Sequence, residues 1–293
     1  MERLVEGGHF FEGARWHDGH WWVSDLYARH VLRIAPGGSS QIAAKLDCQP
    51  SGLGWLPDGR LLIVVMEQFR ILRQEPDGAL VTHADLKGHV GFWPNDMAVD
   101  DNGYAWVTNL GFNLWVGEKP APADLVCVSP KGKVSIVASD MLFPNGLVVL
   151  PDRKTLVVAE SFGNRMAAFT IGESGALSDR RLFAEFGPPP SWETVEEFVK
   201  EDFAPDGCAA DVEGCVWVAD ALNNRVCRVA DGGAILEELR TPEGMGIYSC
   251  ALGGPDGHSL LMCCAPDYHD EARKAKAEAV LYVDRVAVPA MTK

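Results

Sequence analysis

Six residues with oxygen-bearing side chains recur at one position of a repeated sequence motif. Each opens a phrase that reads as strand, tight turn, strand, and four of them directly follow a proline. These residues, here called the ring positions, are Glu12, Ser51, Asn95, Asn145, Asp206 and Ser249. Single residues of these types often just close turns, as Asn, Asp and Ser do routinely. Their matched register in all six units favours a shared site instead.

The ring positions predict a site for one divalent cation. Oxygen ligands without His or Cys suit Ca²⁺, Mg²⁺ or Mn²⁺ better than Zn²⁺, although geometry and metal availability also set selectivity, so Fe²⁺ and Zn²⁺ stay open. A dication at such a site can act as a Lewis acid on a carbonyl or lower the pKa of a bound water. The chemistry that this pattern favours is therefore attack on a polarised carbonyl group.

The elements that position these residues follow from the repeats. Examples of the repeated phrase are "PSGLGWLPDGRLLIVV" from Pro50 and "PNDMAVDDNGYAWVTN" from Pro94. The DG, DNG and EG turns suit hairpins because Asn, Asp and Gly tolerate positive φ. Most units add a third and a fourth short apolar run. Six units of four strands predict an all-β fold, a six-bladed β-propeller, as one domain over residues 1–293.

The two ends of the chain are expected to close the propeller. The last unit stops after its third strand, at "LYVDRVAVP", and the amino-terminal "RLVEGG" is predicted to supply the missing outer strand. In a propeller the ring positions surround one end of the central channel. Closure would leave no open sheet edge on the last blade.

One insertion interrupts the repeats between blades four and five. Residues 187–203, "GPPPSWETVEEFVKEDF", predict a short helix capped by Ser191, with Trp192, Val195, Phe198 and Val199 as its apolar face. A second helix is predicted over residues 270–279. Propeller geometry places both on the face of the ring positions, so we expect residues 187–203 to form a lid.

Composition limits the classes of partner. The net charge of −15 and the pI near 4.9 disfavour nucleic acid and anionic membranes, and no apolar run approaches the ~20 residues that span a bilayer. The amino terminus lacks a signal-peptide pattern. The eight cysteines form no CxxC pair, which favours buried, reduced thiols in a cytoplasmic protein. We expect a small-molecule substrate; the sequence does not indicate an oligomeric state.

The sequence resembles the superfamily of regucalcin (senescence marker protein), gluconolactonase and luciferin-regenerating enzyme. The resemblance covers essentially the whole chain, through "EGARW" near the amino terminus and "PND", "PNG" and "PDG" at successive blades. It implies a six-bladed propeller with one catalytic divalent cation and lactone hydrolysis as the characteristic reaction.

The resemblance also implies roles for individual residues. Glu12, Asn145 and Asp206 match the family's metal ligands, and Asn95 matches an asparagine that binds substrate or a coordinated water. Asp206 is the best candidate for the base that activates water, although a hydroxide generated by the cation could serve instead. Asp96 is expected to brace its loop by accepting backbone N–H groups.

The sequence departs from the sugar-lactone hydrolases of this family at Trp93. An arginine that grips the sugar hydroxyls stands at that position in those enzymes. Trp93 and Phe143 predict an apolar, aromatic pocket, and Asn109 and Ser161 could complete it by hydrogen bonding to the substrate. The expected substrate is thus a lactone less polar than gluconolactone.

Two further hypotheses stay open from the sequence. The same site could support isomerase, lyase, ester or phosphotriester chemistry, because polarising a carbonyl serves all of these and the fold does not choose among them. Alternatively, the propeller binds a ligand or calcium without catalysis. The convergent oxygen ring counts against a scaffold, which needs no such ring.

Overall fold

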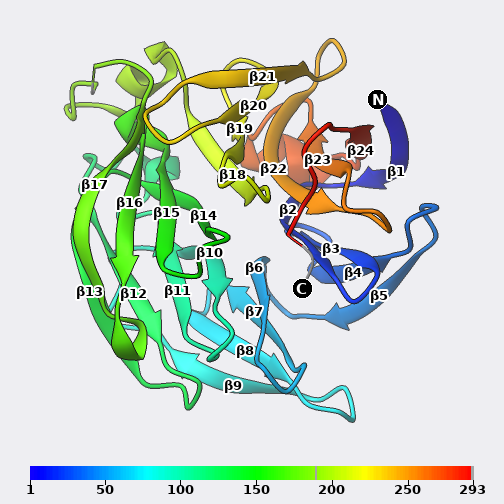
Figure 1. Cartoon of the computed structure of the whole chain (residues 1–293). Helices are drawn as coiled ribbons and strands as arrows, with labels where there is room; N and C mark the ends of the chain where they lie inside the picture. Colours follow the sequence, from blue (N-terminus) through cyan, green and yellow to red (C-terminus); the bar gives the residue numbers. More distant parts are fainter. Residues whose placement is uncertain (189, 292–293) are drawn as a thin grey trace.

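Six four-stranded antiparallel sheets surround a central channel in this computed structural model, which describes residues 1–188 and 190–291 (Figure 1). This arrangement confirms the predicted six-bladed β-propeller. Pro189 of the predicted insertion and residues 292–293 of the predicted domain lie outside the described residues. No helix among the described residues is long and apolar enough to cross a membrane.

The strands of each blade follow in chain order from the channel outward, except in blade six. Blades one and two comprise β2 (Phe11–His17), β3 (His20–Asp25), β4 (His30–Ile34), β5 (Ser40–Lys45), β6 (Pro50–Trp55), β7 (Leu61–Val65), β8 (Arg70–Gln74) and β9 (Leu80–Asp85). Blades three and four comprise β10 (Pro94–Val99), β11 (Ala105–Asn109), β12 (Ala123–Val128), β13 (Val134–Met141), β14 (Pro144–Val149), β15 (Thr155–Glu160), β16 (Arg165–Ile171) and β17 (Leu177–Glu185). Blade five comprises β18 (Pro205–Ala210), β19 (Val216–Asp220), β20 (Arg225–Val229) and β21 (Ile235–Arg240).

Blade six combines both ends of the chain. Its strands are β22 (Gly246–Gly253), β23 (Ser259–Ala265), β24 (Ala279–Arg285) and β1 (Glu2–Gly8), and β1 pairs antiparallel with β24 as the outer strand. Figure 1 shows the blue β1 beside the red β24. The prediction that the amino-terminal segment closes the last blade is therefore confirmed.

The core lies between neighbouring blades. The second strand of a blade is apolar on both faces because a blade packs against it on each side, so all five residues of β7, "LLIVV", are buried. Between blades two and three, for example, Leu62 and Val64 form one cluster with Met97 and Val107. This packing fixes the inner strands around the channel.

Every inner strand has an irregularity at the same end. The register with the second strand shifts once within the first part of the inner strand, and these shifts lie between Glu12 and Arg15, Pro50 and Leu53, Pro94 and Met97, Pro144 and Leu147, Pro205 and Cys208, and Ile247 and Ser249. Such bulges free a residue from the ladder and redirect its side chain. Each shift falls at or beside a ring position.

Glycine follows four ring positions because adjacent inner strands nearly touch there. A Cβ at Gly146 would lie 2.4 Å from the carbonyl oxygen of Asp206, and one at Gly207 would lie 2.6 Å from the Cα of Ser249. Similar clashes occur at Gly13 and Gly52. These glycines are thus needed for close approach of the strands rather than for a turn.

The insertion between β17 and β18 is helical but differs from the prediction. It contains the 3₁₀ helix η4 (Val195–Lys200), which follows Thr194 and has no side-chain cap, so the predicted cap at Ser191 is wrong. The rings of Trp192 and Phe198 pack together, with 5.3 Å between their centroids. Residues six apart on one α-helix point to different sides, so this contact requires the chain to turn before the helix starts. The side chain of Val199 lies outside the described part.

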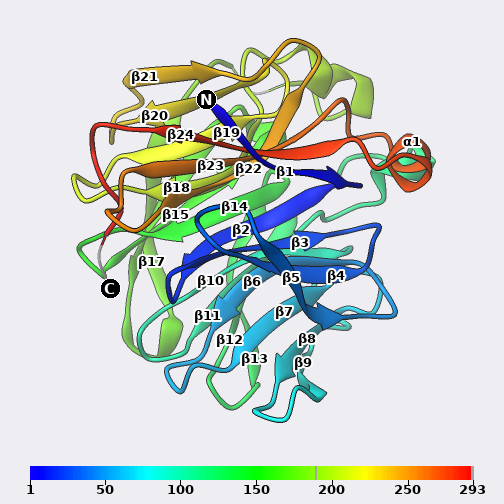
Figure 2. The same ribbon diagram turned by 90° about the vertical axis from the view of Figure 1, so that its right-hand side faces the viewer.

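The other helices are short. The predicted helix over residues 270–279 is present as α1 (Asp270–Ala275) and ends early because Ala279 already pairs with Gly8 in blade six. In Figure 2, α1 lies at one face of the propeller, at the right of the view. The remaining 3₁₀ turns are η1 (Leu114–Val116), η2 (Ser161–Gly163) and η3 (Glu173–Gly175).

Replacing Gly146 with alanine should destabilise the propeller by about 1–3 kcal/mol, because the new methyl group meets backbone atoms of blade five that cannot move alone. Gly37 is a matched control: it is exposed, and a Cβ there meets nothing within 4 Å. Urea unfolding of Gly146→Ala and Gly37→Ala measures the difference. Equal stabilities would show that the inner strands are not tightly packed at this mouth.

Candidate active site

The ring positions converge at one mouth of the channel, and three of them are joined by hydrogen bonds. Ser51 Oγ donates to Asn95 Oδ1 (3.0 Å), and Asn95 Nδ2 donates to Asn145 Oδ1 (2.7 Å). Asn145 Nδ2 in turn donates to Ser161 Oγ (3.2 Å). Side chains from blades two, three and four are thus held in fixed orientations with their oxygen atoms close together.

The two carboxylates of the ring complete the mouth from blades one and five. Burial raises the pKa of Glu12 well above its usual range, and the nearby negative charge of Asp206 raises it further. Burial likewise raises the pKa of Asp206, with the carboxylate of Asp96 adding to the effect. These acids therefore favour either a proton or a positively charged partner.

The hydrogen bonds at the two carboxylates leave acceptor atoms unused. Asp206 Oδ1 is buried and has no hydrogen-bond partner among the described residues. Glu12 Oε2 accepts the N–H of Gly13 (3.2 Å). A buried carboxylate oxygen without a partner is costly, which indicates that the site is built for a ligand.

This donor set fits a hard divalent cation. Two carboxylates and the amide oxygen of Asn145 supply only oxygen, and an amide oxygen that accepts one hydrogen bond keeps a second lone pair. Within residues 1–188 and 190–291, no group of three or more His, Cys, Asp or Glu side chains could hold a metal. The candidate site therefore depends on Asn145 as its third ligand.

An ion pair closes the channel below the ring. Arg15 Nη2 donates to Asp96 Oδ1 (2.7 Å) and to the carbonyl oxygen of Met97 (2.6 Å), which joins blade one to blade three. Asp96 Oδ1 also accepts the N–H of Met97 (2.8 Å), as the sequence predicted for a bracing residue. Because Arg15 pairs with Asp96, it offsets the buried charge of Glu12 only in part.

Above the ring lies a cavity of about 180 Å³ with a polar end and apolar walls. Its polar lining comes mainly from Glu12, Asn95, Asn145, Ser161 and Asp206. The walls are aromatic and aliphatic, and they comprise Phe10, Leu26, Tyr27, Met66, Leu110, Leu114, Trp115, Phe143, Phe162, Val195, Phe198, Ala204, Ala221, Leu222, Tyr248 and Tyr268. A ligand here would place a polar group on the ring and an apolar body against the walls.

The insertion contributes directly to this cavity. Val195 and Phe198 of η4 are part of the lining. Phe198 stacks on Phe162 with 4.0 Å between ring centroids and 5° between planes, and Phe162 lies 4.1 Å from Phe143. Val195 and Phe198 of the insertion therefore cover part of the cavity, and Phe198 does so through a continuous set of aromatic contacts.

Three of the predicted substrate-binding residues line the cavity and two do not. Asn95, Ser161 and Phe143 are in the lining. Trp93 stacks on Phe92 (5.0 Å) and lies behind Trp115, whose ring it meets at 5.0 Å. This is a correction to the prediction: Trp93 supports the wall through Trp115.

Asn109 also lies outside the lining, because its amide is used by backbone groups. Its Nδ2 donates to the carbonyl oxygen of Asp124 (2.6 Å), and its Oδ1 accepts the N–H of Gly111 (3.1 Å). Sequence reasoning missed Tyr248, which does line the cavity. Its position directly before the ring residue Ser249 was the signal that could have identified it.

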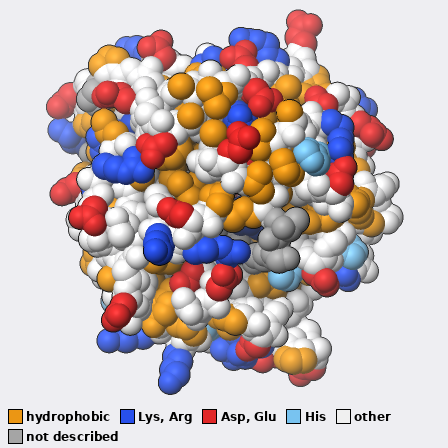
Figure 3. Space-filling view, viewed as in Figure 1, with side chains coloured by type: hydrophobic (Ala, Val, Ile, Leu, Met, Phe, Trp, Pro, Cys, Tyr) orange, Lys and Arg blue, Asp and Glu red, His pale blue; other side chains and the backbone are white. Residues whose placement is uncertain are grey.

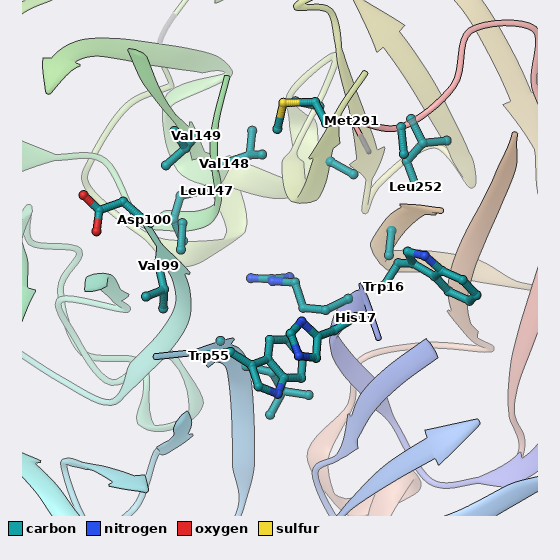
Figure 4. Close-up of a pocket in the computed structure, with 18 of the residues that line it drawn as sticks. Trp16, His17, Trp55, Val99, Asp100, Leu147, Val148, Val149, Leu252 and Met291 are labelled. Atoms are coloured by element: carbon teal, nitrogen blue, oxygen red, sulfur yellow. The ribbon is translucent and has the colours of Figure 1, made fainter. Parts of the chain in front are cut away.

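A second cavity, of about 250 Å³, lies at the opposite mouth of the channel (Figure 4). The C-terminal halves of the inner strands line it, and His17 stacks on Trp55 at 4.0 Å on one side. Hydrophobic side chains gather around the centre of this face, with charged groups among and around them (Figure 3). None of the ring positions belongs to this lining, so the ring serves only the first cavity.

The fold and the ring define a class: a six-bladed propeller with hard oxygen donors at one mouth of its channel. Residues 10–265 match the model of the SMP-30/Gluconolactonase/LRE-like region. The chain belongs to this family. The resemblance inferred from the sequence is thereby confirmed.

Curated relatives and solved structures agree with this assignment. The chain is 25% identical over 270 residues to 6-deoxy-6-sulfogluconolactonase of Pseudomonas putida, covering 91% of this chain and 87% of the relative. It is 26% identical over 252 residues to regucalcin of Bos taurus, covering 83% of this chain and 78% of the relative. The structure of a calcium-binding protein, regucalcin, from Agrobacterium tumefaciens superposes with a TM-score of 0.80 at 20% identity, covering 99% and 95%. The gluconolactonase structure from Xanthomonas campestris superposes with a TM-score of 0.74 at 24% identity, covering 96% of this chain and 89% of the other.

Asp206→Asn should change stability in opposite directions with and without a divalent cation. In a chelator, the wild type loses stability as pH rises above the ordinary carboxyl range, because its folded state must release protons held at a raised pKa. The neutral amide removes part of this loss, so the variant should be the more stable protein near about pH 8, by about 1 kcal/mol or more.

Adding Ca²⁺, Mg²⁺ or Mn²⁺ should reverse this order, because only the wild type gains a cation bound to Asp206. Thermal unfolding from about pH 5 to about pH 8, with chelator and with each ion, measures both effects. Asp101→Asn, a surface acid paired with Arg153, is the control and should respond to neither condition. The same order of stability in every solution would show that Asp206 holds no cation.

Proposed function

We propose that this protein hydrolyses a lactone or related cyclic ester less polar than a sugar lactone, at a divalent-cation site formed by Glu12, Asn145 and Asp206. The observation that carries the proposal is the buried Asp206 oxygen without a partner, next to Glu12 and at the base of an apolar cavity. Family membership supports the reaction type, since relatives are named gluconolactonase and 6-deoxy-6-sulfogluconolactonase.

The ring residues divide the work of hydrolysis. A divalent cation bound by Glu12, Asn145 and Asp206 would polarise the lactone carbonyl and lower the pKa of water at the site. Asp206 accepts the proton of the attacking water. Asn95, fixed between Ser51 and Asn145, holds the polar end of the substrate against the ring.

The hydrogen bonding of the cavity supports a substrate with few hydroxyl groups. Asn95 and Asn145 already donate to neighbouring side chains, and Ser161 Oγ donates to the carbonyl oxygen of Pro205 (2.7 Å). A polyhydroxylated sugar lactone would lose its water and find too few free partners here for all of its hydroxyl groups, which is unfavourable. The apolar walls instead favour an alkyl or aryl lactone.

The aromatic cover contributes by excluding water. Phe198 of the insertion lies on Phe162, and both line the cavity. A dry site strengthens the electrostatic interactions that stabilise the oxyanion formed on the carbonyl. The insertion thus supports both substrate binding and the chemical step.

The wild type should hydrolyse alkyl and aryl lactones with a kcat/KM at least about tenfold above that for gluconolactone, the discrimination that a hydrophobic pocket provides. Asp206→Ala should lower kcat by about 10²-fold or more, because it removes both a ligand and the base. Acid release in a pH-stat measures both quantities.

Asp101→Asn again serves as the control and should keep wild-type rates. A preference for gluconolactone would contradict the argument from the apolar walls while leaving the site intact. Full activity of Asp206→Ala would remove that residue from the mechanism.

A further inference from the structure

Tyr248 occupies a special place at the start of blade six. It lies between Ile247 and Ser249, where the register of β22 with β23 shifts, so it has no partner across the ladder. It is 5% exposed and lines the cavity that also contains Asp206. Its ring packs on Phe10, with 4.8 Å between the centroids. The side chain is therefore held in place at the wall of the candidate active site.

The hydroxyl group of Tyr248 lies next to the backbone of Gly246 and forms no hydrogen bond with any described residue. A Cβ at Gly246 would lie 2.5 Å from the hydroxyl oxygen, so this glycine provides the space that the hydroxyl needs. No side-chain or backbone group within residues 1–188 and 190–291 forms a hydrogen bond with it. Tyr27, another tyrosine of the cavity lining, is half-buried, and Asp270 beside its hydroxyl adds to the effect of burial in raising its pKa. Because Tyr248 lines the cavity and its hydroxyl has no partner in the described part of the chain, this hydroxyl is available to a ligand.

The surroundings keep this phenol protonated. Burial raises the pKa of Tyr248 above its ordinary value, and the negative charge of Asp206 raises it further. The group thus stays protonated, and able to donate a hydrogen bond, to higher pH than an ordinary tyrosine. A weakly acidic donor of this kind can protonate a strongly basic alkoxide as it leaves, whereas a weakly basic oxygen leaves without protonation.

We propose that Tyr248 is the general acid of the hydrolysis, donating its proton to the ring oxygen of the lactone as that oxygen leaves. This inference rests on the proposed function. It assigns the two proton transfers to different residues of one cavity: Asp206 at the ring positions is the base, and Tyr248 in the wall is the acid.

The step balances without any further reagent. The oxygen of water forms a bond to the carbonyl carbon, and one proton of that water passes to Asp206. The bond between the carbonyl carbon and the ring oxygen then breaks, and the ring oxygen takes the electron pair of that bond and the phenol proton of Tyr248. The phenolate regains the proton that Asp206 accepted. The net change is addition of one water to give a hydroxy acid.

The leaving group provides the test. An aliphatic δ-lactone releases an alkoxide about as basic as hydroxide, whereas dihydrocoumarin releases a much less basic phenolate, with a conjugate-acid pKa of about 10. Only the first needs an acid. Tyr248→Phe should therefore lower kcat for δ-valerolactone by about 10²-fold or more and leave kcat for dihydrocoumarin close to that of the wild type.

Tyr27→Phe is the matched control and should change both substrates by the same factor, because its hydroxyl lies beside Asp270. Thermal unfolding of both variants establishes that they fold, and a series of dihydrocoumarins with substituted phenol leaving groups adds an independent readout. Across that series, rates of Tyr248→Phe should fall more steeply with leaving-group basicity than wild-type rates.

Equal losses on both lactones, or parallel slopes across the series, would overturn the general-acid role and leave Tyr248 as a packing residue. A wild type that hydrolyses neither lactone would instead overturn the proposed function, and this inference with it. The two failures are distinguishable because the first keeps wild-type activity and the second does not.

Discussion

The close approach of the inner strands at one channel mouth is the constraint on which the site depends. Gly146 and Gly207 permit this approach, since a Cβ at either would meet backbone of the next blade. The bulge beside each ring position then directs a polar side chain into the narrow space. Packing between blades therefore concentrates the oxygen atoms of Asn145 and Asp206, which are 61 residues apart in the numbered chain.

The close oxygen atoms include buried carboxylates that repel one another, and within the described residues an ion pair neutralises only one of these carboxylates. Asp96 takes the place that glycine holds in four other blades, and Arg15 neutralises it across the channel. The same arginine offsets the buried charge of Glu12 only in part, and burial raises the pKa values of Glu12 and Asp206. These two acids therefore favour a proton or a positively charged ligand at the ring positions.

The repeated register accounts for what the sequence could predict. Hairpin turns and alternating apolar residues identified the blades, and alignment of the repeats identified the ring positions without any contact information. The strand closing blade six followed from the missing fourth strand. These features depend on local pattern, which a sequence carries directly.

The walls of the cavity depend on tertiary packing, and the sequence predicted them less well. Trp93 and Asn109 lie in the expected loops, but stacking on Phe92 and backbone hydrogen bonds keep their side chains out of the cavity. Tyr248 directly precedes the ring residue Ser249, which places it near the mouth of the channel, but the bulge beside it cannot be seen in the residue types alone. Loop conformation was therefore the information that the sequence lacked.

Phe143 links the cover of the site to its polar end. It has φ of 57°, a conformation that a bulky residue adopts only when its surroundings hold it there, and it stands two residues before Asn145. Its ring meets Phe162, and Phe162 meets Phe198 of the insertion. The three aromatic rings thus connect the insertion to the constrained backbone next to Asn145.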